Sequence, residues 1–186
     1  QSSRVCSMLQ GPSAEVALPT KQCPAWVLLN AGGTGYYRGG YTREQLTKLL
    51  ATPAAAFTPA EQVSLWADVD AAVTRGDLPL GEALKAAPAS AKSPNRLVVQ
   101  SAASLLELVR LDQLTPEERQ RFRAWVASLY SARAHAMGWV PKPGEDDSVK
   151  DSRSLFLRLA GGLGDDPRLV KESLPLVRAW LADRKS

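Results

Sequence analysis

The stretch TPEERQRFRAWVASLYSARAHAMG, residues 115–138, decides the fold class of this 186-residue chain. Thr115 is followed by Pro116, and Glu118 lies three positions after the threonine, which is the pattern of a helix-starting capping box with proline at the first helical position. Gly138 suits the C-terminal cap. Apolar residues recur between these ends at helical spacing: Phe122, Val126, Leu129 and Ala132. The stretch therefore predicts one long amphipathic helix.

Other helix starts lie on both sides of this one. Thr42 with Gln45, and Thr58 with Glu61, repeat the capping pattern. Asp166-Pro167 opens a last helix, in which Pro175 predicts a kink or a break. Apolar stripes at helical spacing mark these helices and two more: Leu46, Leu49 and Leu50; Leu65, Val69, Ala72 and Val73; Val98, Ala102, Leu105, Leu106 and Val109; Leu155, Leu159 and Leu163; Val170, Leu174, Val177 and Leu181.

Short polar connections join these helices, which favours antiparallel neighbours. Residues 42–186 are therefore predicted to form a mainly α domain, a HEAT- or armadillo-like helical array that stacks as an α–α superhelix. No exact repeat period is visible, so the repeats are expected to be structural and degenerate.

Residues 1–41 have a different pattern, because their apolar runs are short and alternating and are separated by Gly and Pro. They predict a small antiparallel β segment that precedes the helices. The glycines of NAGGTGYYRGGY, residues 30–41, lack the spacing of either common phosphate-binding loop. The simpler interpretation is a turn between two strands, with Gly32 and Gly33 at positive φ.

Composition excludes several classes of protein. The net charge of +4 is spread along helical faces, without the clustered basic patch of a nucleic-acid-binding surface. No apolar run has the length of a transmembrane helix, and no signal peptide is recognisable. The chain begins QSSRVCSM, without an initiator Met, which favours an internal piece of a longer protein or a processed end.

Candidate reactive residues are few. His135 is the sole histidine, so neither an HExxH motif nor a Ser-His-Asp set can be assembled, and a capping or packing role is expected. The acidic run 145–147 is expected to precede a helix, and Trp66, Trp125, Trp139 and Trp180 are expected in the core. Cys6 and Cys23 are compatible with a local disulfide, which would indicate an oxidising compartment, or with two free buried thiols. The residues alone indicate no catalytic and no metal site.

The segment AWVLLNAGGTGYYRGGYT, residues 25–42, resembles the aminopeptidase-N-like zinc metallopeptidases, in which a W-V-x-x-N-x-x-x-x-G-Y-Y-R-V-x-Y pattern closes a β-sandwich domain and leads into a helical domain. Gly39 departs from the valine usual there and is expected to loosen the strand. Later segments, 68–88 and 130–183, resemble following parts of the same family in order. The matching residues of the first motif are Trp26, Val27, Asn30, Gly35, Tyr36, Tyr37, Arg38 and Tyr41.

The resemblance implies that residues 1–41 are the last strands of a β-sandwich and that residues 42–186 are the front part of the C-terminal helical domain. Family members carry the zinc ligands, the catalytic glutamate and the GAMEN glutamate in a preceding domain, so no catalytic or metal residue is transferred to this chain. The implied function is that of a non-catalytic fragment of a zinc-dependent aminopeptidase, whose helical domain covers the substrate chamber and controls access.

The partners implied by the resemblance are the catalytic domain of the same polypeptide and the peptide substrate, with zinc as cofactor of the full-length parent. The PGED segment and the CPAW segment resemble bacterial members, in which the two cysteines can pair. A secreted, periplasmic or cell-envelope location is therefore expected, with a cytoplasmic location as the alternative. A free-standing helical interaction module is the alternative function.

Overall fold

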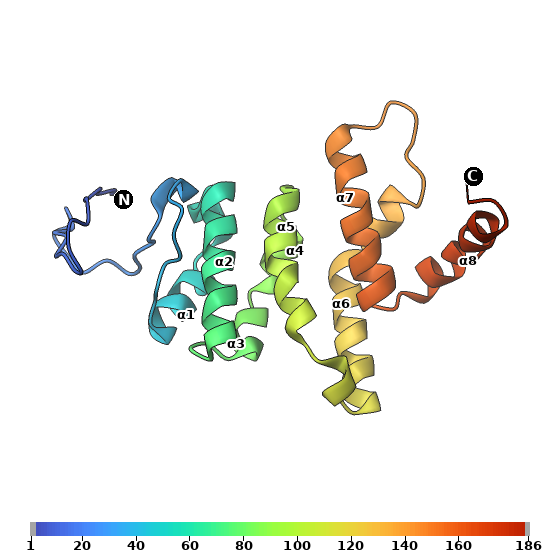
Figure 1. The fold of residues 1–186 in the computed structure, drawn as a ribbon, viewed down its shortest axis with the longest axis horizontal. Coiled ribbons are helices and arrows are strands. Elements are labelled where there is room, and N and C mark those ends of the chain that lie inside the picture. Colours follow the sequence, from blue (N-terminus) through green and yellow to red (C-terminus); the bar gives the residue numbers. More distant parts are fainter. Residues whose placement is uncertain (1–2, 185–186) are drawn as a thin grey trace. The chain divides into compact units, whose positions relative to one another are not determined.

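The computed structural model describes residues 3–184, which divide into two compact units. The first unit ends at Ala83 and the second begins at Leu84. The α-helices, coloured along the chain in Figure 1, are α1 Arg43–Ala51, α2 Pro59–Arg75, α3 Leu80–Leu84, α4 Ala87–Ala91, α5 Arg96–Ala103, α6 Pro116–Met137, α7 Asp147–Leu157 and α8 Pro167–Ala182. The shorter helical turns are η1 Ala31–Gly33, η2 Ala54–Ala56, η3 Ser104–Leu108, η4 Leu111–Gln113 and the π-helical η5 Arg158–Leu163.

Local sequence signals set the helix ends. Thr42, Thr58 and Thr115 each form a capping box, in which the threonine side chain accepts from a backbone N–H of the first turn and the Gln or Glu side chain accepts from the threonine N–H. Gly138, with a φ of 66°, caps the far end of α6 and donates its N–H to the Ala134 carbonyl. The prediction of a mainly helical region after residue 42 is confirmed, since the α-helices lie within residues 43–182.

The prediction of a preceding antiparallel β segment is wrong. No β-strand forms within residues 3–184, and residues 3–41 have no regular secondary structure apart from η1. Val16 and Leu18 alternate as a strand would, but both are exposed, and their backbone finds no neighbouring strand. An alternating pattern creates a strand only where a second strand completes its hydrogen bonds. The boundary drawn between residues 41 and 42 stays a prediction.

The first unit has a small core formed by α1, α2 and the segments beside them. Trp26 packs its ring against Phe57 at a centroid distance of 5.1 Å, so the beginning of the aromatic loop is held by apolar contact. The other buried apolar side chains of this unit are Leu46, Leu49, Leu65, Trp66, Val69, Ala72, Leu78 and Ala83.

The second unit has the larger core, built where α6, α7 and η5 pack together. Tyr130 of α6 and Phe156 of α7 are fully buried, and their rings meet edge to face at 6.1 Å. The Arg133 guanidinium lies 4.0 Å from the centre of the Phe156 ring and donates to the carbonyls of Ala91 and Ser93. This cluster ties α4 to α6 and α7.

Helix α8 departs from two expectations. It continues through Pro175 without a break. Trp180, expected in the core, is half exposed. None of the helices within residues 3–184 is both long and apolar enough to cross a lipid bilayer.

Candidate functional site

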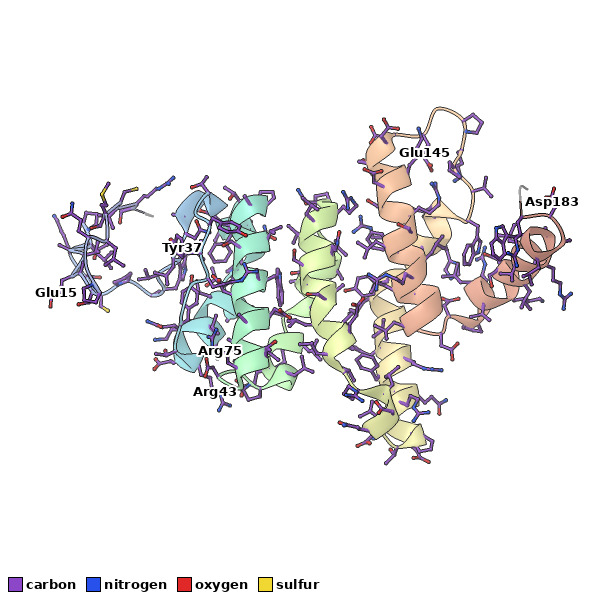
Figure 2. The ribbon with its side chains drawn as sticks, viewed as in Figure 1. Glu15, Tyr37, Arg43, Arg75, Glu145 and Asp183 are labelled. Carbon is purple, nitrogen blue, oxygen red and sulfur yellow. The ribbon has the colours of Figure 1, made fainter. Side chains whose placement is uncertain are left out.

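The aromatic loop, residues 29–41, is fastened to helix α2 by a set of hydrogen bonds that we call the loop clasp. Three polar side chains of α2 take part, and their spacing of three and four residues places them on one face of the helix. They are Glu61, Ser64 and Asp68. Figure 2 labels Tyr37 on the loop beside α2.

Asn30 is the centre of the clasp and has a left-handed backbone with a φ of 55°. Its side-chain Nδ2 donates to the Gly35 carbonyl at 3.0 Å and to the Ser64 hydroxyl at 2.9 Å, while its Oδ1 accepts from the Gly35 N–H at 2.6 Å. Its own N–H donates to the Tyr37 hydroxyl at 2.8 Å. Asparagine suits this position because it tolerates the left-handed region and carries both a donor and an acceptor.

Glu61 serves two elements at once. Its Oε1 accepts from the Gly32 N–H at 2.8 Å, and its Oε2 accepts from the Thr58 N–H at 2.8 Å as part of the α2 capping box. Burial would raise the pKa of this carboxyl, but the hydrogen bonds from Thr58 and Gly32 and the charge of Arg4 hold its pKa below the usual value. Glu61 is therefore a charged anchor for both the helix start and the loop.

Asp68 is the most buried member of the clasp, with an exposed fraction of 2%, and its Oδ1 accepts from the buried Gly39 N–H at 2.8 Å. Burial raises the pKa of Asp68, while the Gly39 N–H and the charges of Arg38 and Arg75 oppose that rise. A Cβ atom on residue 39 would lie 2.8 Å from Asp68 Oδ2. Gly39 thus allows a close approach to the carboxylate, and the expected role of loosening a strand does not apply because no strand forms.

Tyr41 closes the far end of the clasp by accepting the Leu29 N–H on its hydroxyl at 2.9 Å. Burial, with smaller contributions from the nearby Asp68 and Tyr37, raises the pKa of Tyr41 to about 12, so this phenol stays neutral at physiological pH. Tyr36 and Arg38 of the same motif are exposed, and the Tyr36 side chain stands fully in solvent.

Replacement of Asp68 tests the clasp in the first unit. Asp68→Ala is expected to lower the free energy of unfolding by about 1–3 kcal/mol, because the buried Gly39 N–H loses its acceptor. Asp68→Asn keeps an acceptor oxygen and removes the buried charge, so its free energy of unfolding should stay within about 1 kcal/mol of the native value. Urea denaturation of both variants measures this difference. Equal losses in the two variants would contradict the hydrogen bond to Gly39.

A second polar cluster lies in the second unit, where α6 meets the start of α8. His135 Nε2 lies 3.1 Å from Asp166 Oδ2, and Asp166 Oδ1 caps α8 by accepting from the Arg168 and Leu169 N–H groups. Burial would raise the pKa of Asp166, but the side chain of Ser131, the Leu169 N–H and His135 together hold that pKa below its usual value. The expected packing role of His135 thus takes the form of a tie between two helices.

The lowered pKa of Asp166 predicts an acid-sensitive contribution to stability. A folded-state pKa below the unfolded value means that the stabilisation is complete above the unfolded pKa of about 4 and is lost as the pH falls through the folded value. Asp166→Asn keeps the helix cap, since Asn and Asp are similar N-cap residues. The native advantage over this variant in free energy of unfolding should therefore shrink as the pH falls below about 5. A pH-independent difference between the two proteins would contradict this account.

Arg153 of α7 holds the loop 138–146 that precedes its own helix. Its guanidinium donates to the carbonyls of Met137 and Gly138 and forms an ion pair with Glu145 in which both side chains are largely buried. Glu145 is labelled at the start of α7 in Figure 2. Asp146 caps α7 through the Ser148 N–H, as expected for the acidic run before a helix.

Neither cluster has the composition of a metal or catalytic centre. Within residues 3–184, no group of three or more His, Cys, Asp or Glu side chains is placed to hold a metal ion. Cys6 and Cys23 are free and exposed in the structure, so the structure does not join them, and the disulfide stays a prediction. The clasp holds the loop against α2 and leaves the Tyr36 side chain fully exposed.

The clasp depends partly on residues outside the motif: Glu61 was expected only as a helix-capping residue, and Ser64 and Asp68 were not singled out. Asn30, Gly35, Tyr37 and Tyr41 belong to the predicted motif, whereas the three acceptors on α2 do not. One feature of the sequence could have indicated the role of Asp68. It directly precedes Val69 of the apolar stripe, and a carboxylate that is buried beside such a stripe needs a hydrogen-bonding partner.

Comparison with known proteins now decides the family. The family model described as "ERAP1-like C-terminal domain" matches residues 26–186, which is most of the chain. The chain belongs to this family. The match begins at Trp26 and therefore includes the aromatic loop and the clasp of this ERAP1-like C-terminal domain.

A curated relative agrees with the family. The chain is 26% identical over 151 residues to the puromycin-sensitive aminopeptidase of Caenorhabditis elegans, and the alignment covers 78% of this chain. It covers 16% of the relative, so the chain corresponds to a small part of that protein. The resemblance to the C-terminal region of an aminopeptidase is confirmed, while the bacterial type stays a prediction.

Proposed function

We propose that this chain is a non-catalytic part of a zinc-dependent aminopeptidase that docks on the catalytic domain of the same polypeptide and covers its substrate chamber. The observation that carries the proposal is the family match over residues 26–186, supported by a relative named as an aminopeptidase. The sequence contains one histidine and no HExxH motif, so we assign the zinc to polypeptide outside these residues. No step of peptide cleavage is assigned to this chain.

Exposed apolar side chains in the first unit support docking on other polypeptide. Isolated apolar side chains are common on protein surfaces, but a run of them along one segment is typical of an interface. Beside this run the clasp holds the fully exposed Tyr36 on a loop fixed by several hydrogen bonds, and a rigid aromatic side chain is a common interface anchor. The exposed apolar residues before the loop are Val5, Met8, Leu9, Val16, Leu18, Val27 and Leu29.

A mixing experiment tests the proposal. The catalytic portion encoded with this chain is purified separately, and its cleavage of an aminoacyl-p-nitroanilide and of short peptides is measured with and without residues 1–186. We expect a complex, and a changed rate or size preference for peptides in the mixture. Tyr36→Ala should weaken the complex about tenfold, while Lys85→Ala, at an exposed site in the second unit, should have no effect.

The absence of a complex together with unchanged cleavage would contradict the proposal. An open reading frame that encodes these residues without any peptidase motif would favour the alternative, a free-standing helical interaction module.

We also propose a secreted, periplasmic or cell-envelope location, supported by the two cysteines that lie within one short segment. Oxidation of Cys6 and Cys23 would close a loop of about 18 residues and contribute about 3 kcal/mol in the chain-entropy model. Thiol titration of denatured, unreduced protein purified from its native compartment should then detect no free thiol. Two titratable thiols would instead favour the cytoplasm.

A further inference from the structure

Helix α8 presents an apolar stripe to solvent. Its four members have exposed fractions between 39% and 60%, and their spacing of four, three and four residues is that of a coiled-coil seam. Leu169, on another side of the helix, is fully buried and attaches α8 to the core of the second unit. The residues that we call the α8 stripe are Val170, Leu174, Val177 and Leu181.

The second half of α8 has little support from its own unit. All residues from Leu174 to Ala182 are exposed, and Pro175 lies inside this half. An interior proline destabilises an α-helix by about 3 kcal/mol, and short helices depend on packing for most of their stability. A helix half with this composition gains stability when a second element covers its stripe.

One edge of the stripe carries uncompensated positive charge. Lys171 and Arg178 are seven residues apart and follow the same edge, and neither forms an ion pair within residues 3–184. Arg168, by contrast, is paired with Glu172 on a different side of the helix. The opposite edge carries Trp180, which is half exposed and has the Arg184 guanidinium 5.7 Å from its ring centre.

We propose that the α8 stripe binds an amphipathic helix of polypeptide outside this chain, and that this partner helix carries carboxylates along the edge facing Lys171 and Arg178. Charges beside an apolar seam select the partner of a helix pair. Trp180 would then become the buried aromatic anchor at the other edge. This inference is independent of the proposed peptidase function, because it requires only α8 and its charges.

A second copy of this chain fits the stripe poorly. An antiparallel pair of α8 helices places the row of Lys171 and Arg178 against the same row of the partner, where like charges repel. A parallel pair places that row against Ser173 and Trp180, which offer no carboxylate. Charge complementarity therefore favours an acidic helix over self-association.

The test uses two synthetic helical peptides with the complete chain. Both are about 28 residues long and share one leucine seam at heptad spacing, and the positions beside the seam are glutamate in one peptide and lysine in the other. Isothermal titration calorimetry should detect saturable binding of the glutamate peptide and at least tenfold weaker binding of the lysine peptide.

Two variants then separate the charges from the fold. The double reversal Lys171→Glu with Arg178→Glu should weaken the glutamate peptide about tenfold and strengthen the lysine peptide by a similar factor. The matched control reverses two exposed lysines elsewhere, Lys21→Glu with Lys85→Glu, and should leave the preference unchanged. Circular dichroism verifies that both variants keep the native helix content.

Several results would overturn the proposal. These are no saturable binding of the glutamate peptide at about 100 μM, equal binding of both peptides, or a preference that the double reversal does not change. Sedimentation equilibrium that shows a dimer dissociated by Leu174→Glu would assign the stripe to a second copy. Binding to phosphatidylserine vesicles without binding to the peptide would assign it to a lipid surface.

Discussion

Replacement of Phe156 by alanine is expected to lower the free energy of unfolding of the second unit by about 3–5 kcal/mol, the range for removal of a buried phenylalanine. Phe156 is fully buried and contacts Tyr130 edge to face. The Arg133 guanidinium, which lies 4.0 Å from the ring centre, would lose its aromatic partner while staying partly buried. Chemical denaturation followed by circular dichroism measures the loss.

Two controls separate the packing of Phe156 from a general effect of substitution. Phe156→Leu keeps much of the apolar volume and should cost less than Phe156→Ala. Val140→Ala changes an exposed side chain and should stay within about 0.5 kcal/mol of the native value. A Phe156→Ala variant as stable as Val140→Ala would contradict the position of Phe156 at the centre of the core.

Replacement of Gly33 by alanine is expected to cost about 3 kcal/mol and to open the loop clasp. Gly33 has a φ of 65°, a backbone conformation that is unfavourable for other L-residues by about 1–2 kcal/mol. A Cβ atom at this position would also lie 2.7 Å from the carbonyl oxygen of Ala60, so the loop or the first turn of α2 would have to shift. Hydrogen exchange should show that the amides of Gly32 and Gly39 lose protection.

Gly76→Ala is the matched control for Gly33→Ala. Gly76 also has a positive φ, of 85°, but a Cβ atom there would have no neighbour within 4 Å. Its cost should be about 1 kcal/mol, without any loss of protection at Gly32 and Gly39. Equal costs for the two variants would show that the contact between the loop and α2 contributes nothing.

The helix starts could be predicted from the sequence because they depend on neighbouring residues. Thr115 and Glu118 form their capping box within one turn, so the pattern of residue types contains the whole interaction. Pro175 shows the limit of such local rules, since α8 continues through it.

The absence of the β segment and the presence of the clasp could not be predicted in the same way, because both depend on residues distant in the sequence. Alternation at Val16 and Leu18 resembles a strand, but a strand needs a partner, and no β-strand of any kind forms within residues 3–184. The bond from Gly39 to Asp68 joins residues 29 positions apart, and only the folded chain brings them together. The turn glycines Gly32 and Gly33 were predicted correctly at positive φ, although they connect no strands.

In the function proposed above, these residues dock on a catalytic domain and cover its substrate chamber, while the reactive zinc belongs to other polypeptide. The most direct test is to purify residues 1–186 alone, to measure bound zinc by mass spectrometry, and to assay release of amino-terminal residues from short peptides. We predict no stoichiometric zinc and no release above background. One zinc ion per chain together with robust peptide trimming would contradict the account.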